Sequence, residues 1–311
     1  MNKRERVLGV ISGQDKSGYV PAAFFLHFPP DCHVGPAAVN KHLEFFNYTD
    51  MDFVKIQYER TFPPRPEIKS PADWAKMPVY AKEFYEGQLG VVKGLVEAAK
   101  GEALVVLTLY SPFMCAGHTN PKVVEHMAAD PDKVKIGMQA ITESLMIFVR
   151  ECIALGLDGF YHSTQGGEAH RFADRSLFDQ CVRPYDLALM DEINQRCEFN
   201  ILHVCDYNDV YDDLTPFVNY PGDVVNASLH LTTGELTGAE VARLFGRPFM
   251  GGLERKGAIL HGSKDDIRLA VEKALATAPE RFILGADCTI PSEVNWDNLK
   301  YAISLAHAGR R

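Results

Sequence analysis

The sequence lacks a long apolar run. No stretch of the 311-residue chain approaches the roughly 20 consecutive apolar residues that a helix needs to cross a membrane. The start of the chain, MNKRERVLGVISGQDKSG, holds only a short and broken apolar stretch, so a secretory signal is not expected. These two absences predict a cytoplasmic protein that does not bind membranes.

An excess of positive charge is also missing. The chain has 32 Lys and Arg against 41 Asp and Glu, a formal net charge of -9 at pH 7. Nucleic acids and anionic membranes select basic surfaces, so we expect neither as a general partner. The seven cysteines are odd in number and scattered along the chain, a pattern typical of reduced thiols rather than of a disulfide framework.

Two phosphate-binding fingerprints are absent. No GxGxxG follows the first predicted strand, and GxxxxGK[ST] occurs nowhere in the chain. Both absences argue against an open, doubly wound sheet, which is the alternative to the fold proposed next. There is also no internal repeat, low-complexity tract or linker, so we expect residues 1–311 to form one domain.

Eight short apolar runs alternate with longer segments in which apolar residues recur three or four positions apart. The runs, predicted to be strands, cover residues 19–28, 51–57, 103–110, 157–163, 200–204, 223–229, 247–253 and 281–287. The longer segments, predicted to be helices, include residues 83–100, 132–156, 175–196, 238–246, 263–278 and 295–309. A strand followed by a helix, repeated eight times, predicts a (β/α)8 TIM barrel.

Local signals refine this prediction. Asp130 before Pro131 is a plausible helix cap, and Ser263 with Asp266 has the spacing of a capping box. The loop over residues 60–71 is too rich in proline for regular structure and could cover the mouth of the barrel.

Three metal-ligating side chains close two of the predicted strands. His203 and Cys205 end the run FNILHVC, and Cys288 ends the run FILGADC. Residues at i and i+2 of a strand point the same way, so His203 and Cys205 can chelate one ion. A His, Cys, Cys set suits tetrahedral zinc with one open position. The alternative is that all three are ordinary buried residues, because free cysteines and strand histidines often pack in cores.

Chemistry in such a barrel collects at the carboxyl ends of the strands, and many polar residues fall there. They are His27, Gln57, Glu59, Tyr110, Ser111, Tyr161, His162, Ser163, His203, Cys205, Asp206, Asn226, Ser228, His230, Glu254, Asp287 and Cys288. Some of these residues could simply be solvated strand ends.

From this set and the loop that follows residue 163 we select six further candidates. His162, Glu168 and Asp206 are the catalytic candidates, and His27, Tyr110 and Arg171 are the cofactor-binding candidates. Asp206 could orient His203 or cap the next helix. Arg171 could hold an anionic group or brace the loop by pairing with a carboxylate.

Four segments together resemble the uroporphyrinogen decarboxylase superfamily over nearly the whole chain. They are LYSPFMCAGH, GLDGFYHSTQGG, FDQCVRPYDLALMDEI with the following ILHVCD, and GGLERKGAILHGSKDDIRLAVEKAL with the following ILGADCTIP. Within the superfamily, HxC with a distant Cys looks like the methylcobamide:thiol methyltransferase branch. It is also similar to the zinc site of cobalamin-independent methionine synthase. The resemblance implies zinc on His203, Cys205 and Cys288, a corrinoid (methylcobalamin) as methyl donor, and a homodimer.

The zinc interpretation has a simple chemical basis. A free thiol with a pKa near about 8.5 is mostly protonated at neutral pH, and coordination to zinc deprotonates it. Two thiolates and a neutral imidazole leave the metal centre neutral, which favours a bound small-molecule thiol as nucleophile over the activation of water. We therefore predict an enzyme that transfers a methyl group to or from a corrinoid.

The chain also departs from the family patterns. Decarboxylases carry an arginine motif after the first strand, whereas this chain reads FFLHFPPDCHVG there, which argues against porphyrinogen decarboxylation. Asp206 stands where methyltransferases usually have glycine. No corrinoid-binding DxHxxG segment is present, so a cobalamin would arrive free or on a partner protein. Two alternatives stay open: a lyase that holds polycarboxylates with Arg171, Arg175 and Lys256, and a barrel that binds a tetrapyrrole or corrinoid without turnover.

Overall fold

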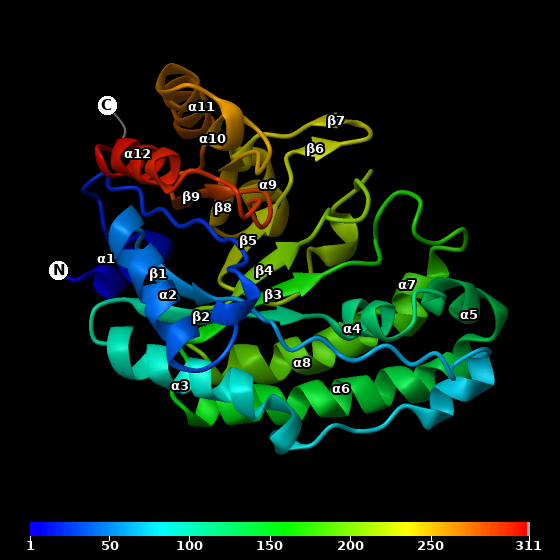
Figure 1. The fold of residues 1–311 in the computed structure, drawn as a ribbon. Coiled ribbons are helices and arrows are strands. Elements are labelled where there is room, and N and C mark those ends of the chain that lie inside the picture. Colours follow the sequence, from blue (N-terminus) through cyan, green and yellow to red (C-terminus); the bar gives the residue numbers. More distant parts are fainter. Residues whose placement is uncertain (310–311) are drawn as a thin grey trace.

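A curled sheet of parallel strands forms the centre of the molecule (Figure 1). The computed structural model describes residues 1–309, and in this range the sheet has seven strands in the order β1-β2-β3-β4-β5-β8-β9. They are β1 (Phe53–Ile56), β2 (Leu104–Tyr110), β3 (Gly159–Thr164), β4 (Ile201–Val204), β5 (Val224–Ala227), β8 (Phe249–Leu253) and β9 (Phe282–Ala286). A small antiparallel hairpin of β6 (His230–Leu231) and β7 (Gly234–Glu235) follows β5.

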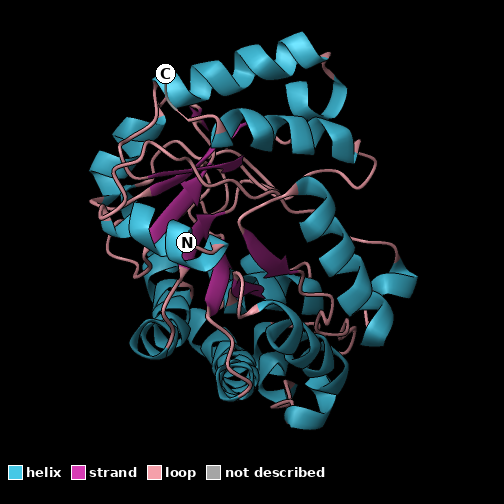
Figure 2. Cartoon of the chain, turned by 90° about the vertical axis from the view of Figure 1, so that its left-hand side faces the viewer, coloured by secondary structure: helices cyan, strands magenta, loops and turns pink. Residues whose placement is uncertain are grey.

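Helices surround the sheet, as Figure 2 shows from the side on which the N-terminus lies. They are α1 (Lys3–Ser12), α2 (Gly35–Thr49), α3 (Glu86–Ala99), α4 (Pro112–Thr119), α5 (Val123–Ala129), α6 (Pro131–Ala154), α7 (Ser176–Cys181), α8 (Arg183–Arg196), α9 (Gly238–Phe245), α10 (Ala258–His261), α11 (Lys264–Ala276) and α12 (Trp296–His307). This arrangement confirms the predicted TIM-barrel-like fold. Within residues 1–309, no helix combines the length and apolarity needed to cross a bilayer.

The first predicted strand, residues 19–28, is not a regular strand, although it does occupy the eighth position of the barrel wall. On the β9 side it pairs only through two isolated parallel bridges, Ala22 with Leu284 in β9 and Leu26 with Ile290 beyond the end of β9. On its other side, Asp52 N donates to Ala22 O at 2.9 Å, just before β1. The segment therefore closes the wall between β9 and β1 with few hydrogen bonds.

Proline explains this irregularity. Pro21 has no backbone N–H to donate to a neighbouring strand, which disfavours a central position in a sheet. A proline pair ends the segment, because Pro29 precedes the short 3-10 helix Pro30–Cys32. The apolar residues in between are buried, so the run marks the barrel wall without forming a regular strand.

Helix α1 closes the end of the barrel at which the strands begin. Arg4 of α1 forms an ion pair of 2.8 Å with Asp158, which precedes β3 and has a buried side chain. Arg4 also pairs with Glu198, which precedes β4. The opposite end, where the strands finish, is not covered by α1, and this is the end at which such barrels carry their active sites.

The predicted helix caps are confirmed. The Asp130 side chain accepts a hydrogen bond from Lys133 N, and Ser263 with Asp266 forms a capping box. The helix predicted over residues 175–196 is divided at Val182, because a proline follows two residues later at the start of α8. The proline-rich loop is irregular as predicted, and Figure 1 shows it running past α4 toward α5.

Candidate metal centre

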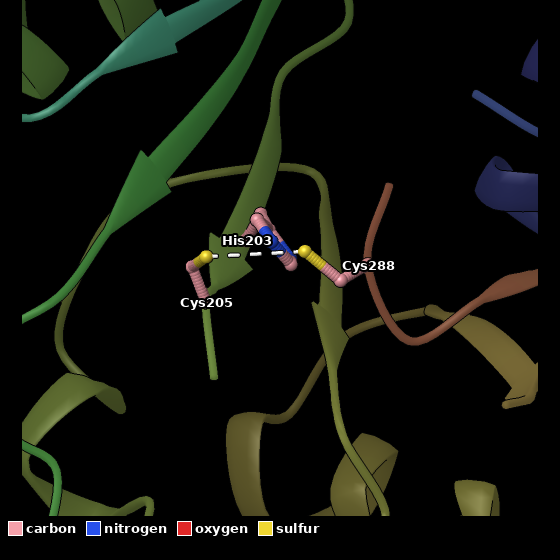
Figure 3. Close-up of side chains that lie close together, drawn as sticks. All are labelled: His203, Cys205 and Cys288. Carbon is pink, nitrogen blue, oxygen red and sulfur yellow. Dashed lines mark hydrogen bonds between the residues drawn. The ribbon is translucent and has the colours of Figure 1, made fainter. Parts of the chain in front are cut away.

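His203, Cys205 and Cys288 converge where β4 and β9 end (Figure 3). One ligand atom from each residue lies within 4.8 Å of the others, and the two sulfur atoms are 3.9 Å apart. All three residues are buried. Figure 3 shows the imidazole ring beside the line that joins the two sulfurs. The convergence predicted from the sequence is therefore observed.

The strands explain how distant residues reach this point. Cys205 N donates to Thr164 O at 3.0 Å, which prolongs the pairing of β3 with β4 by one residue and keeps His203 and Cys205 on the same face. Beyond β9, Asp287 N donates to Leu253 O at 2.9 Å and holds the chain beside β8 as it reaches Cys288.

The geometry fits a tetrahedral zinc ion. Two Zn–S bonds of about 2.3 Å at a tetrahedral angle put the sulfurs about 3.8 Å apart, close to the observed 3.9 Å. This separation is far beyond the about 2.05 Å of a disulfide, and all seven cysteines are free. His203 Nδ1 is buried without a hydrogen-bond partner, a costly arrangement for an empty pocket. No other His, Cys, Asp or Glu of residues 1–309 belongs to the group, so three donors leave one position open.

The two cysteine sulfurs are hydrogen-bonded to each other. The pKa of Cys205 lies well below its usual range because the Cys288 thiol donates a hydrogen bond to it and the His203 imidazole lies beside it. The pKa of Cys288 is raised well above its usual range because its thiol donates this hydrogen bond to Cys205. Gln165 Nε2 also donates to Cys205 Sγ at 3.4 Å. These contacts favour the thiolate form at Cys205, and binding of a metal would displace the proton of Cys288.

An arginine joins the two halves of the site. Arg255, just after β8, donates from Nη1 to Asp206 at 2.7 Å and to Asp287 at 3.0 Å, and its backbone N donates to Asp287 at 2.8 Å. Asp206 directly follows Cys205, and Asp287 directly precedes Cys288. All three side chains are largely buried. Arg255 therefore fixes the spacing between Cys205 and Cys288 from outside the donor set.

An aromatic ring supports the imidazole. Tyr161 of β3 stacks on His203 with ring centroids 4.7 Å apart and an interplanar angle of 29°. The Tyr161 hydroxyl donates to Asn226 Oδ1 at 2.6 Å, and Asn226 Nδ2 donates to Met250 O and Ala286 O. This network fixes the ring plane and links four strands beneath the site.

The structure does not bring His162 to this centre. In the strand register, Ser163 pairs with His203, whereas His162 pairs with Leu202. Because side chains alternate along a strand, His162 points away from the donor set, toward Met190 and its neighbours on α8. Both of its ring nitrogens are buried without a hydrogen-bond partner, and burial lowers its pKa to about 3. A catalytic role does not fit this position.

The other catalytic candidates form ion pairs. Glu168 accepts two hydrogen bonds from Arg171, at 2.8 and 3.2 Å, and one from Gly166 N at 2.7 Å. This pair braces the loop after β3, so Arg171 is not free to hold an anion, and the Glu168 carboxylate is occupied by these hydrogen bonds. Asp206 neither caps a helix nor bonds to His203, the two roles considered for it, because it accepts from Arg255 instead.

The remaining cofactor-binding candidates lie around the barrel mouth. His27 Nδ1 is 2.9 Å from Glu59 Oε1, and the His27 side chain is 40% exposed. Tyr110 ends β2 opposite Ser163, on the face of the sheet that carries His203. Burial is the main cause that raises the Tyr110 pKa, with further contributions from Glu59, Cys205 and Cys288. These residues stay candidates for contact with a bound molecule.

Sequence reasoning missed two charged residues at the site. Lys55 on β1 is buried inside the barrel, and Arg255 clamps the aspartates. For Lys55 a signal was available, because it lies two residues before Gln57 and so on the same face of the strand. Nothing local indicates the second, since its partners are more than 30 residues away.

The chain belongs to the uroporphyrinogen decarboxylase (URO-D) family, whose model matches residues 50–309. A search of curated proteins by sequence found no match.

Solved structures share the fold. A methyltransferase from Methanosarcina mazei is similar with a TM-score of 0.80 and 14% identity, over 98% of each chain. A putative vitamin-B12 independent methionine synthase from Listeria monocytogenes has a TM-score of 0.56 and 12% identity, over 98% of this chain and 94% of that one. A B12-independent methionine synthase from a Shewanella strain gives 0.56 and 10%, over 94% and 95%. Such identities establish a common fold and no more.

Proposed function

We propose that the protein is a zinc-dependent methyltransferase that transfers a methyl group between a corrinoid and a small-molecule thiol. The observation that carries the proposal is the convergence of His203, Cys205 and Cys288 with one position left open. The common fold with a methyltransferase and with methionine synthases supports an enzyme of this class. A barrel that only binds a corrinoid would have no need for this donor set.

Each residue of the site has a separate role in the proposed reaction. His203, Cys205 and Cys288 would hold the ion, which supplies acidity that converts an acceptor thiol to its thiolate. Tyr161 keeps the imidazole in one plane, and Arg255 keeps the two cysteines at a fixed spacing. In the transfer, the thiolate sulfur forms a bond to the methyl carbon. The bond between that carbon and its donor breaks, and the donor keeps the electron pair.

The donor would enter at the carboxyl end of the strands, the end opposite α1. The chain has no corrinoid-binding DxHxxG segment, so we propose that methylcobalamin arrives free or on a partner corrinoid protein. His27 and Tyr110, at the rim of this mouth, are the side chains proposed to touch it. The reverse transfer, from a methylated thiol to the corrinoid, needs the same geometry.

The lyase alternative is weakened by the arginines on which it depended. Arg171 is paired with Glu168, and Arg175 donates to Asp212 at 2.5 Å. Arginines that already neutralise carboxylates of the protein are poor anchors for the carboxylates of a substrate. No specific observation favours the lyase over the transferase.

The test compares the wild type with Cys288→Ser. We expect the wild type to retain one zinc ion per chain by elemental analysis and the variant to lose it, because serine is a poor zinc ligand. With methylcobalamin and 2-mercaptoethanol, the wild type should demethylate the cobalamin, followed by absorbance, and the variant should not. Cys32→Ser, at a half-buried cysteine on another segment, is the matched control.

Two outcomes would contradict the proposal. Wild-type protein without bound zinc, together with methyl transfer that survives in Cys288→Ser, would remove the metal from the reaction. Spectral binding of cobalamins by the zinc-loaded wild type, without loss of methyl groups to any thiol tested, would select the non-catalytic binding protein instead.

A further inference from the structure

Lys55 is an unusual cation for the interior of a barrel. It is the only lysine or arginine within residues 1–309 that is buried, with 4% of its surface exposed. It lies on β1 in register with Val106 of β2. Its Nζ donates a hydrogen bond to Gln57 Oε1, which also accepts from Thr108 Oγ1 at 3.1 Å. No carboxylate of these residues forms an ion pair with Lys55.

Two aromatic rings hold the ammonium in place. Lys55 Nζ lies 4.5 Å from the ring centroid of Phe25 and 4.8 Å from that of Tyr161. The negative faces of such rings attract a cation, more strongly when it is desolvated. The ring of Tyr161 also stacks on His203, so a single ring touches both the ammonium and a metal ligand. The charge of Lys55 is therefore one side chain away from the metal centre.

The charges of the centre show what such a cation can do. Zinc with two thiolates and a neutral imidazole has no net charge, and a thiolate in the open position makes it -1. A neutral ligand in that position leaves it at zero. Nearby opposite charges inside a protein attract more strongly than in water, so a fixed ammonium stabilises the anionic state and has little effect on the neutral one.

We propose that Lys55 is a positioning residue that makes the metal centre select an anionic ligand, a thiolate, over a neutral one. This inference rests on the proposed function and adds to it the charge state in which the acceptor binds. Burial lowers the pKa of Lys55 to about 7, whereas the nearby cysteines and Glu59 act in the opposite direction. Ionised sulfur in the site therefore favours the charged form of Lys55.

The experiment uses full-length protein loaded with cobalt, whose absorbance reports the ligands of the ion. Wild type, Lys55→Met and Lys55→Gln are titrated at pH 7 with 2-mercaptoethanol, which binds as an anion, and with imidazole, which binds neutral. Lys93→Met removes an exposed, remote charge from α3 and serves as the control. Both Lys55 variants should bind the thiol on the order of tenfold more weakly and imidazole as the wild type does.

The outcomes separate this proposal from the one on which it rests. Failure of the wild type to bind cobalt or zinc removes the proposed function itself. Cobalt bound by every variant, with thiol affinity unchanged or with thiol and imidazole affinities lowered equally, overturns the role of Lys55 alone. An equal loss for both ligands is the signature of a merely structural residue.

Discussion

His203 and His162 lie on neighbouring strands, β4 and β3, and each is only 2% exposed. On the inner face of the sheet, His203 meets two sulfurs and the ring of Tyr161. On the outer face, His162 meets apolar side chains such as Ile193 of α8 and makes no hydrogen bond. Burial and residue type are the same for both histidines, so the face of the strand decides which one can bind a metal.

The difference between the two histidines can be tested most directly by replacing each of them with leucine. His203→Leu should lose zinc, with affinity lowered by more than about 100-fold, since changes to mere supporting residues already cost about 10- to 100-fold. His162→Leu should retain one zinc ion per chain. Elemental analysis and chelator competition measure both. Equal zinc loss in the two variants would mean that the outer face contributes to the site.

A second difference between the faces appears with pH. Burial lowers the His162 pKa to about 3, below the about 6.5 of an unfolded chain. Between these values the unfolded state binds the extra proton, so His162 makes the protein less stable as the pH falls through this window. The slope is about 1.4 kcal/mol per pH unit.

In His162→Leu this contribution disappears. The free energy of unfolding, measured with urea at several pH values, should fall less steeply below about pH 6.5 than in the wild type. The buried His42, whose pKa burial lowers to about 4, is present in both proteins and cancels. Parallel curves for the two proteins would contradict the assignment of His162 as a buried neutral residue.

The smallest expected effect concerns the residues that frame the inner face. Arg255→Met leaves Asp206 and Asp287 without their shared partner, next to Cys205 and Cys288. We expect zinc affinity to fall about tenfold, because the spacing of the ligands is no longer fixed. The control Arg175→Met breaks the ion pair with Asp212 and should leave the zinc affinity unchanged. Equal affinities in the two variants would show that the Arg255 clamp is not used.

Much of this site could be predicted from the sequence, and the reasons for the gaps are physical. Strand ends carry the chemistry in a barrel, and residues at i and i+2 share a face, which was enough to identify His203, Cys205 and Cys288. His162 was misplaced because every residue of β3 is buried, so no polar alternation reveals which side faces inward.

The same limits apply to the fold. Seven predicted strands are present, whereas residues 19–28 have the apolar composition of a strand but not its hydrogen bonds. Lys55 could not be predicted to be buried because lysine is almost never buried unless it has a partner, and apart from Gln57 its partners here are rings from other segments. Pairings of this kind depend on tertiary contacts that no local pattern records.

The incomplete seam between β9 and β1 has a consequence for how an ion could leave. β4 is hydrogen-bonded along four residues on each side, which anchors His203 and the approach to Cys205. Cys288 follows β9, whose other neighbour, the irregular segment of residues 19–28, makes one isolated bridge on each side of Cys288, at Leu284 and at Ile290. Segments with few backbone hydrogen bonds open at lower free energy. If a bound ion left, its bond to Cys288 at the seam would therefore break first, while His203 and Cys205 still bound the ion.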